Sequence, residues 1–240
     1  MSPENTDFLY PFIDSAEHDA DSLLTDLAES ASAKATENSR LCRSCLETLG
    51  NDLEQVAGMI ADRFRVGACL YTFGNGGSAT DAASTAALFS RSPGHTGLAA
   101  RCLVADQAVL TAIGNDVGYE LTFSRQLIAF AQPRDIAIGY STSGNSANVV
   151  LAFEEAKRRG LLTVGLAGYE GGHMAASDAV DHCFVVPSHS VHRIQEAQAA
   201  LSYLLWESVH TKLASSRAPA SAGRWQMVVG QASTEPEEAR

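Results

Sequence analysis

The sequence predicts an α/β protein built on a doubly wound parallel β-sheet. Short apolar runs of strand length alternate with longer stretches in which apolar residues recur at helical spacing. Two of the apolar runs end in a polar, glycine-containing segment that leads directly into a helical stretch. Alternation of this kind is typical of strand–helix–strand units, in which helices cover both faces of a parallel sheet.

The N-terminal region predicts helix before the first strand. Residues 1–37 are acidic and rich in alanine, and their leucines give a short amphipathic signal, so we expect a helical arm there. Residues 38–66 continue with a stripe of apolar residues at helical spacing. Gly50, followed by Asn51 and Asp52, predicts the end of one helix and the cap of the next. The stripe comprises Cys45, Leu49, Leu53, Val56, Ile60 and Phe64.

The remaining elements alternate along the chain. From about residue 215 the chain is rich in Ala, Ser, Pro and Glu, which predicts a flexible tail. We therefore divide the chain into a helical arm (1–37), a core domain (38–212) and a tail (213–240). Strands are predicted at residues 68–73, 97–104, 135–140, 161–167 and 182–186. Helices are predicted at residues 78–91, 107–113, 119–131, 147–159 and 190–212.

The composition argues against several classes of partner. The formal net charge of −11 argues against direct binding to nucleic acid or to an anionic membrane, because neutralising phosphates needs clustered Lys and Arg. The N-terminus lacks the basic and apolar regions of a signal peptide, and no apolar run has the length of a membrane span. We expect a cytoplasmic protein with reduced cysteines. Cys42 and Cys45 form a C-x-x-C pair, but the helical stripe favours core packing over a metal site.

The two polar segments predict a phosphate-binding site. The first is Asn-Gly-Gly-Ser at residues 75–78, and the second is Ser-Thr-Ser-Gly-Asn-Ser at residues 141–146. In an open α/β sheet, ligands bind at the carboxyl ends of the strands, and helix N-termini there favour anions. Helix capping alone would explain one such segment, but the hydroxyls of the second exceed what a cap requires. The G-x-x-x-x-G-K-[ST] sequence of a P-loop nucleotide-binding protein is absent.

Four motifs resemble the sugar isomerase (SIS) domain family. They are FGNGGSATDAA (73–83), LTAIGNDVGYELTFSRQ (110–126), STSGNSANVVLAFEEAKRRGL (141–161) and RIQEAQ (193–198). Within the family they are similar to the phosphoheptose isomerase (sedoheptulose 7-phosphate isomerase) group and its non-enzymatic relative, the DnaA initiator-associating protein. The resemblance covers about residues 41–209. It implies a flavodoxin-like αβα three-layer sandwich with a five-stranded parallel sheet, an N-terminal helical hairpin, and a homotetramer whose sites combine more than one subunit.

The resemblance also implies roles for residues of both polar segments. By this resemblance, the sugar's phosphate is held by Ser141, Thr142, Ser143 and Ser146. The residues implied to face or adjoin the sugar are Asn75, Gly77, Ser78, Asp116 and Gln195.

The metal and acid–base residues that the family implies are largely replaced. The heptose isomerases carry a His and a Glu on the helix after N-G-G-S, and a Gln and a His on the last helix. Ser84, Leu88 and Tyr203 stand at three of these four positions, and Gln195 alone remains. Zinc favours three or four protein ligands of N, S or O type, so we expect no zinc and no other cofactor.

A metal-free isomerase would need another base. Moving a proton between adjacent carbons requires a base and a group that polarises the carbonyl. By similarity to SIS isomerases that use a Glu without metal, Glu196 is the candidate base, and His192 or His189 the candidate acid. The alternative is that Glu196 is a structural carboxylate at a subunit contact and that both histidines are loop residues.

Three interpretations of the function of this chain follow, and all assume the resemblance to a family of carbohydrate metabolism. The sequence favours a phosphosugar-binding protein of the phosphoheptose isomerase type, regulatory or divergent, with a ligand such as sedoheptulose 7-phosphate. The first alternative is an active aldose–ketose isomerase that uses Glu196. The second is an oligomeric interaction scaffold that contacts a protein partner through its arm or tail.

Overall fold

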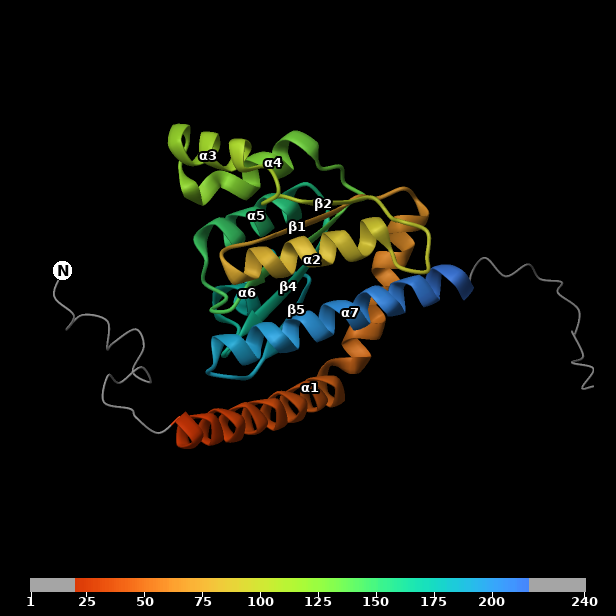
Figure 1. The fold of residues 1–240 in the computed structure, drawn as a ribbon. Helices are drawn as coiled ribbons and strands as arrows, with labels where there is room; N and C mark the ends of the chain where they lie inside the picture. Colours follow the sequence, from red (N-terminus) through yellow and green to blue (C-terminus); the bar gives the residue numbers. More distant parts are fainter. Residues whose placement is uncertain (1–19, 216–240) are drawn as a thin grey trace, which may run out of the picture.

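The computed structural model describes residues 20–215, so the predictions for residues 1–19 and 216–240 lie outside the described residues (Figure 1). Five strands form one all-parallel sheet in the order β2-β1-β3-β4-β5. Each strand overlaps a segment that the sequence predicted as strand, which confirms the predicted sheet. The strands are β1 (Leu70–Gly74), β2 (Ala100–Cys102), β3 (Ile136–Ser141), β4 (Leu162–Gly168) and β5 (His182–Val186).

The helices lie in the connections between the strands and at both ends of the described chain. The single helix predicted at residues 119–131 is divided into a short 3₁₀ helix, η2, and an α-helix. The helical elements are α1 (Ala20–Arg65), α2 (Gly77–Arg91), α3 (Gln107–Asp116), η2 (Tyr119–Leu121), α4 (Thr122–Phe130), α5 (Ala147–Arg158), α6 (Gly172–Ala176) and α7 (Val191–Ser215).

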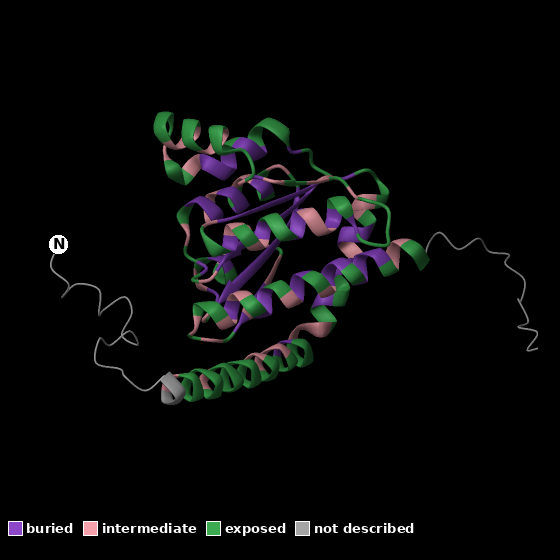
Figure 2. Ribbon diagram, viewed as in Figure 1, coloured by how far each residue is buried: buried purple, intermediate pink, exposed green. Residues whose placement is uncertain are grey.

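Two apolar layers hold helices against the two faces of the sheet, as the αβα sandwich predicts (Figures 1 and 2). Alternate residues of a strand point to opposite faces. Ile136 and Ile138 therefore pack with α1, α2 and α7, whereas Ala137 packs with α4, α5 and α6. Strands β1, β3 and β4 are buried at every position, which explains their continuous apolar runs.

Helix α1 corrects two expectations drawn from the sequence. It is one continuous helix of 46 residues, so Gly50 does not end a helix, and the described residues form no N-terminal helical hairpin. A glycine inside a helix costs about 1 kcal/mol. The fully buried Val56 and Ile60 pack in the same core cluster as α7, and the burial of such side chains is worth about 2 kcal/mol each, which outweighs the glycine.

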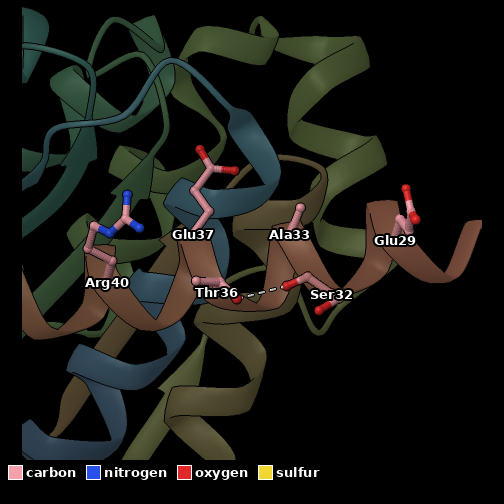
Figure 3. A pocket seen from close by; sticks show the side chains of 6 residues that line it. All are labelled: Glu29, Ser32, Ala33, Thr36, Glu37 and Arg40. Atoms are coloured by element: carbon pink, nitrogen blue, oxygen red, sulfur yellow. Dashed lines mark hydrogen bonds between the residues drawn. The ribbon is translucent and has the colours of Figure 1, made fainter. Parts of the chain in front are cut away.

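The described part of the expected arm is helical, and α1 runs through the expected boundary at residue 37 without a break, so the division of the chain there stays a prediction. Figure 2 shows this part as almost wholly exposed, and Leu24 and Leu27 are 63% and 51% exposed. Arg193 Nη1 donates to the carbonyl of Lys34 at 2.9 Å, which ties the arm to the start of α7. Side chains along one face of the helix, over about three turns, line a hollow of about 490 Å³ on this arm (Figure 3): Glu29, Ser32, Ala33, Thr36, Glu37 and Arg40.

The cysteine prediction holds for the helix core. Cys45 is buried among the apolar side chains of α1, and Cys42 packs beside the same cluster. No helix within residues 20–215 combines the length and the apolar character needed to cross a membrane.

Candidate phosphosugar site

The two polar segments meet at the point where the strand order of the sheet reverses. From β1 the chain moves to β2 on one side and then returns to place β3 on the other side of β1. Gly74 at the end of β1 pairs with Tyr140 near the end of β3, so the two strands end at the same level. A reversal of this kind opens a crevice at the carboxyl edge of the sheet, which is the usual ligand site of an open α/β fold.

Residues 141–146 form a tight turn between β3 and α5. The amide of Gly144 donates to the carbonyl of Ser141 at 3.0 Å, and the hydroxyls of Ser141 and Ser146 lie 3.0 Å apart. Gly144 has a φ of +67°, and a Cβ there would overlap the carbonyl of Gly171. Only glycine combines a favourable positive φ with room for the Gly171 carbonyl, so the close approach of the two loops explains the glycine at position 144.

The loop after β4 fixes this turn from the far side. Gly168 donates its amide to the carbonyl of Thr142 at 2.9 Å, and Met174 donates to the carbonyl of Gly144 at 3.0 Å. The amide of His173 donates to the side-chain carbonyl of Asn145 at 2.9 Å. The turn is therefore held by backbone groups on both sides.

The turn offers hydroxyls above a helix N-terminus. Ser141 is buried, Thr142 and Ser146 are half-buried, and Ser143 is exposed. Ser146 caps α5 by position, but its side chain makes no capping hydrogen bond with the helix. Its hydroxyl bonds Ser141 instead. Free amides and a partial positive charge at the start of α5, together with these hydroxyls, are the arrangement that accepts a phosphate.

A pair of asparagines joins the first polar segment to the first turn of α5. Asn75 Nδ2 donates to Asn148 Oδ1 at 2.8 Å, and Asn148 Nδ2 donates to Asn75 Oδ1 at 2.9 Å. The hydroxyl of Tyr119 also donates to Asn75 Oδ1 at 2.9 Å. Asn148 and Tyr119 were not among the predicted site residues, although both lie inside the motifs that carried the resemblance. Their partners are distant in sequence, so spacing alone could not identify them.

Gln195 reaches the first polar segment from α7. Its carboxamide lies against Gly77, where a Cβ would overlap Nε2 of Gln195. Ser78, the next residue, is only 5% exposed. Asp116 ends α3 and accepts from Asn115 Nδ2 at 2.7 Å, three residues before Tyr119. The structure thus brings Asn75, Gly77 and Gln195 together and leaves the predicted role of Asp116 untested.

The residues at the family's metal positions do not form a zinc site. Ser84 is exposed, Leu88 packs against the core, and Tyr203 is 48% exposed with its ring beside Trp206. Zinc takes imidazole, thiolate and carboxylate ligands, and neither an alkyl side chain nor a serine hydroxyl supplies one. In the part of the chain that the structure describes, no group of three or more His, Cys, Asp or Glu side chains could hold a metal ion.

The predicted base and acid lie at the start of α7. Glu196 Oε1 accepts from Arg193 Nη2 at 2.7 Å. Burial, and after it the charge of Glu196, raises the pKa of the Cys42 thiol, so Glu196 lies on the side of α7 that faces α1. His192 is exposed, and the ring of His189 lies 5.8 Å from that of Tyr169. Catalytic roles for Glu196 and His192 stay predictions.

The sequence of this chain is similar to a known domain family and to curated bacterial proteins. Residues 35–168 match the SIS domain family. A phosphoheptose isomerase of Akkermansia muciniphila is 42% identical over 170 residues, which are 70% of this chain and 89% of that protein. One from Roseiflexus is 42% identical over 174 residues, covering 71% of this chain and 87% of the relative.

Solved structures agree with the fold. The phosphoheptose isomerase from Neisseria gonorrhoeae superimposes with a TM-score of 0.72 at 34% sequence identity, over 77% of this chain and 99% of the other.

Proposed function

This chain belongs to the SIS domain family and, within it, to the phosphoheptose isomerase group; from that premise we propose that it binds a sugar phosphate and interconverts its ketose and aldose forms. The ligand class is a ketose or aldose phosphate such as sedoheptulose 7-phosphate. Relatives 42% identical to the chain bear the name of the isomerase, and this places the isomerase ahead of the regulatory interpretation that the sequence alone favoured.

The observation that carries the proposal is the cross-linked pair of polar segments at the reversal point of the sheet. The turn at residues 141–146 supplies hydroxyls and the N-terminus of α5 to the phosphate. The pair of Asn75 and Asn148 fixes that turn relative to the start of α2. A sugar held by its phosphate would then extend from the turn toward Asn75, Gly77 and Gln195.

The reaction class follows from what such a ligand can undergo. A base removes the proton from the carbon next to the carbonyl, and the resulting enediol is protonated on the neighbouring carbon. Ser84, Leu88 and Tyr203 do not offer the ligands that zinc takes in proteins, so the reaction is described here through side chains alone. The base and the groups that stabilise the enediol must come from this chain or from another copy of it.

The decisive experiment is NMR of the purified protein with sedoheptulose 7-phosphate in deuterated water, with and without added zinc. A new phosphomonoester resonance, or deuterium at C1 of the sugar, would support the isomerase. If the ligand resonance broadens and neither product nor deuterium appears, the pocket binds without chemistry. If it does not broaden, phosphosugar binding itself is rejected for this ligand.

A second candidate is a sugar-phosphate-binding regulator. The replacement of the family's metal and acid–base positions by Ser84, Leu88 and Tyr203 favours it. It predicts that sedoheptulose 7-phosphate changes the oligomeric state or a partner contact and is recovered unchanged. Sedimentation velocity with and without the ligand would measure whether the predicted homotetramer changes its oligomeric state.

A further inference from the structure

Asp81 lies on the face of α2 that carries the family's metal positions. Residues 77, 81, 84 and 88 are spaced by four, three and four, so they form one stripe along the helix. Gly77, at the top of the stripe, touches the carboxamide of Gln195. Ser84 and Leu88 follow below. Asp81 is the one acidic residue in the sequence of α2, and it lies on this stripe between Gly77 and Ser84.

A hydrogen-bonded layer fixes the depth of Asp81 in the fold. The hydroxyl of Tyr140 on β3 lies 2.8 Å from that of Thr85 on α2 and 2.8 Å from that of Ser202 on α7. Asp81 precedes Thr85 by four residues, and Gln198 precedes Ser202 by four. Residues four apart lie above one another on a helix. Asp81 and Gln198 are therefore each one turn closer to the carboxyl edge of the sheet, along the same α2–α7 seam.

This seam holds polar atoms without partners. Oδ2 of Asp81 and both Oε1 and Nε2 of Gln198 are buried and make no hydrogen bond within residues 20–215. Gln198 is 0% exposed, whereas Asp81 is only partly buried as a residue, which leaves its other oxygen accessible. Buried polar atoms are nearly always paired, so these three call for a partner such as a water molecule, an ion or a ligand.

The Gln198 amide can serve as a hydrogen-bond partner for Asp81 both when the carboxyl is protonated and when it is ionised. The Gln198 amide can donate through Nε2 to a carboxylate, and it can accept through Oε1 from a carboxyl. Burial alone raises the pKa of Asp81 to about 6. The titratable neighbour within the seam is Tyr140, whose own pKa is raised to about 12 by burial first and by the charge of Asp81 among lesser causes. A carboxyl that titrates near neutrality is well matched to general base work.

We propose that Asp81 is the base of this chain's isomerisation, and that Gln198 is a positioning residue that steadies it from within the seam. The inference rests on the proposed function. In the forward step, the Asp81 carboxylate takes the proton from the carbon next to the carbonyl. The electron pair of that C–H bond becomes the enediol double bond, and the carbonyl oxygen takes a proton from water. Asp81 then returns the proton to the former carbonyl carbon. The hydroxyl on the carbon that was deprotonated gives its proton to the hydroxide left by the water and becomes the new carbonyl, which completes the isomerisation.

The structure gives a reason to prefer Asp81 over Glu196. Glu196 Oε1 is engaged by Arg193 Nη2 at 2.7 Å in an ion pair, so this carboxylate already has a partner. Asp81 has no basic partner that lowers its pKa. It also lies one turn from Gly77 and so from the Gln195 carboxamide, whose Nε2 can donate to the developing oxyanion.

The test is deuterium exchange at the sugar carbon, followed by NMR with sedoheptulose 7-phosphate for the full chain and its variants. Asp81→Asn keeps the shape and removes the base, so exchange should fall by about 10²-fold or more while phosphosugar affinity changes by less than about 3-fold. The matched control is Asp52→Asn, the same chemical change at an exposed position of α1, which should exchange like the wild type. Glu196→Gln is the competing variant.

The outcomes separate this inference from the proposed function. Absence of exchange in the wild type rejects the isomerase and the role of Asp81 with it. Exchange that survives in Asp81→Asn but is lost in Glu196→Gln leaves the isomerase standing and overturns the role of Asp81.

The pH dependence of exchange in the wild-type protein tests the inference even if the Asp81→Asn variant misfolds. Wild-type exchange should rise with pH through about 6 as Asp81 ionises, and a profile that is flat between pH 5 and 8 would overturn the inference. Gln198→Leu removes the amide that we pair with the Asp81 carboxylate in the working state, so the midpoint should move upward by about half a pH unit or more. An unchanged midpoint would reject the role of Gln198.

Discussion

Asn75 and Asn148, 73 residues apart in sequence, exchange two hydrogen bonds through their side-chain amides. The pair bridges the end of β1 and the first turn of α5, across the reversal point of the sheet. Each amide uses its donor and its acceptor on the other. The pair therefore links the first polar segment directly to the start of α5.

The asparagine pair should behave as one unit. Asn75→Ala and Asn148→Ala should each weaken phosphosugar binding and each destabilise the fold by about 1–2 kcal/mol, because a buried partner loses its hydrogen bonds. The double variant should lose little more than either single one. Calorimetric titration and denaturant unfolding of the four proteins measure both quantities, and fully additive losses would show that the two residues act independently.

The hydroxyls of the turn at residues 141–146 should carry the phosphate. Ser141→Ala combined with Ser143→Ala removes two donors to a charged group, each worth about 1.5–3 kcal/mol, so sedoheptulose 7-phosphate should bind about 10²-fold more weakly or worse. Thermal unfolding should change little, since the backbone holds the turn. Thr80→Ala, an exposed hydroxyl on α2, is the control. Unchanged calorimetric affinity of the double variant would remove the phosphate from this turn.

Gly144 should tolerate no side chain. Its φ of +67° disfavours a Cβ, and the Cβ would meet the carbonyl of Gly171. Gly144→Ala should destabilise the protein by about 2 kcal/mol or more and loosen the phosphate turn. Gly50→Ala, at a helical position with open space around the Cβ, should instead stabilise it by up to about 1 kcal/mol. Urea unfolding of both variants provides the comparison, and equal midpoints would contradict the close approach.

Asp81 should make stability fall as pH rises. Its pKa is raised from 3.8 to about 6 in the folded chain, so between these values the folded state holds a proton that the unfolded state has released. The stabilisation from this proton is complete below pH 3.8 and is lost as pH rises through about 6. The melting temperature of Asp81→Asn relative to the wild type should therefore be higher at pH 7.5 than at pH 5. A difference independent of pH would mean that Asp81 titrates normally.

The sequence predicted the strands and the turn because both leave local signals. Strands buried on two faces read as unbroken apolar runs, as in residues 136–140, and the dense hydroxyls of residues 141–146 follow one of them. The helix break expected at Gly50 was wrong because tertiary burial of Val56 and Ile60 outweighs a local preference.

What the sequence by itself determined is the five strands, most of the helices between them but not α6 (Gly172–Ala176), the two polar segments and the family to which they belong. The tertiary structure alone decided which elements became neighbours: β3 lies beside β1 on the side away from β2, so Asn148 reaches Asn75. It also decided that Asp81 and Gln198 share a buried seam, which no spacing along the chain reveals. Pairing across the sheet and burial between helices are long-range properties, and a pattern read along one chain reports only the residues close to it in sequence.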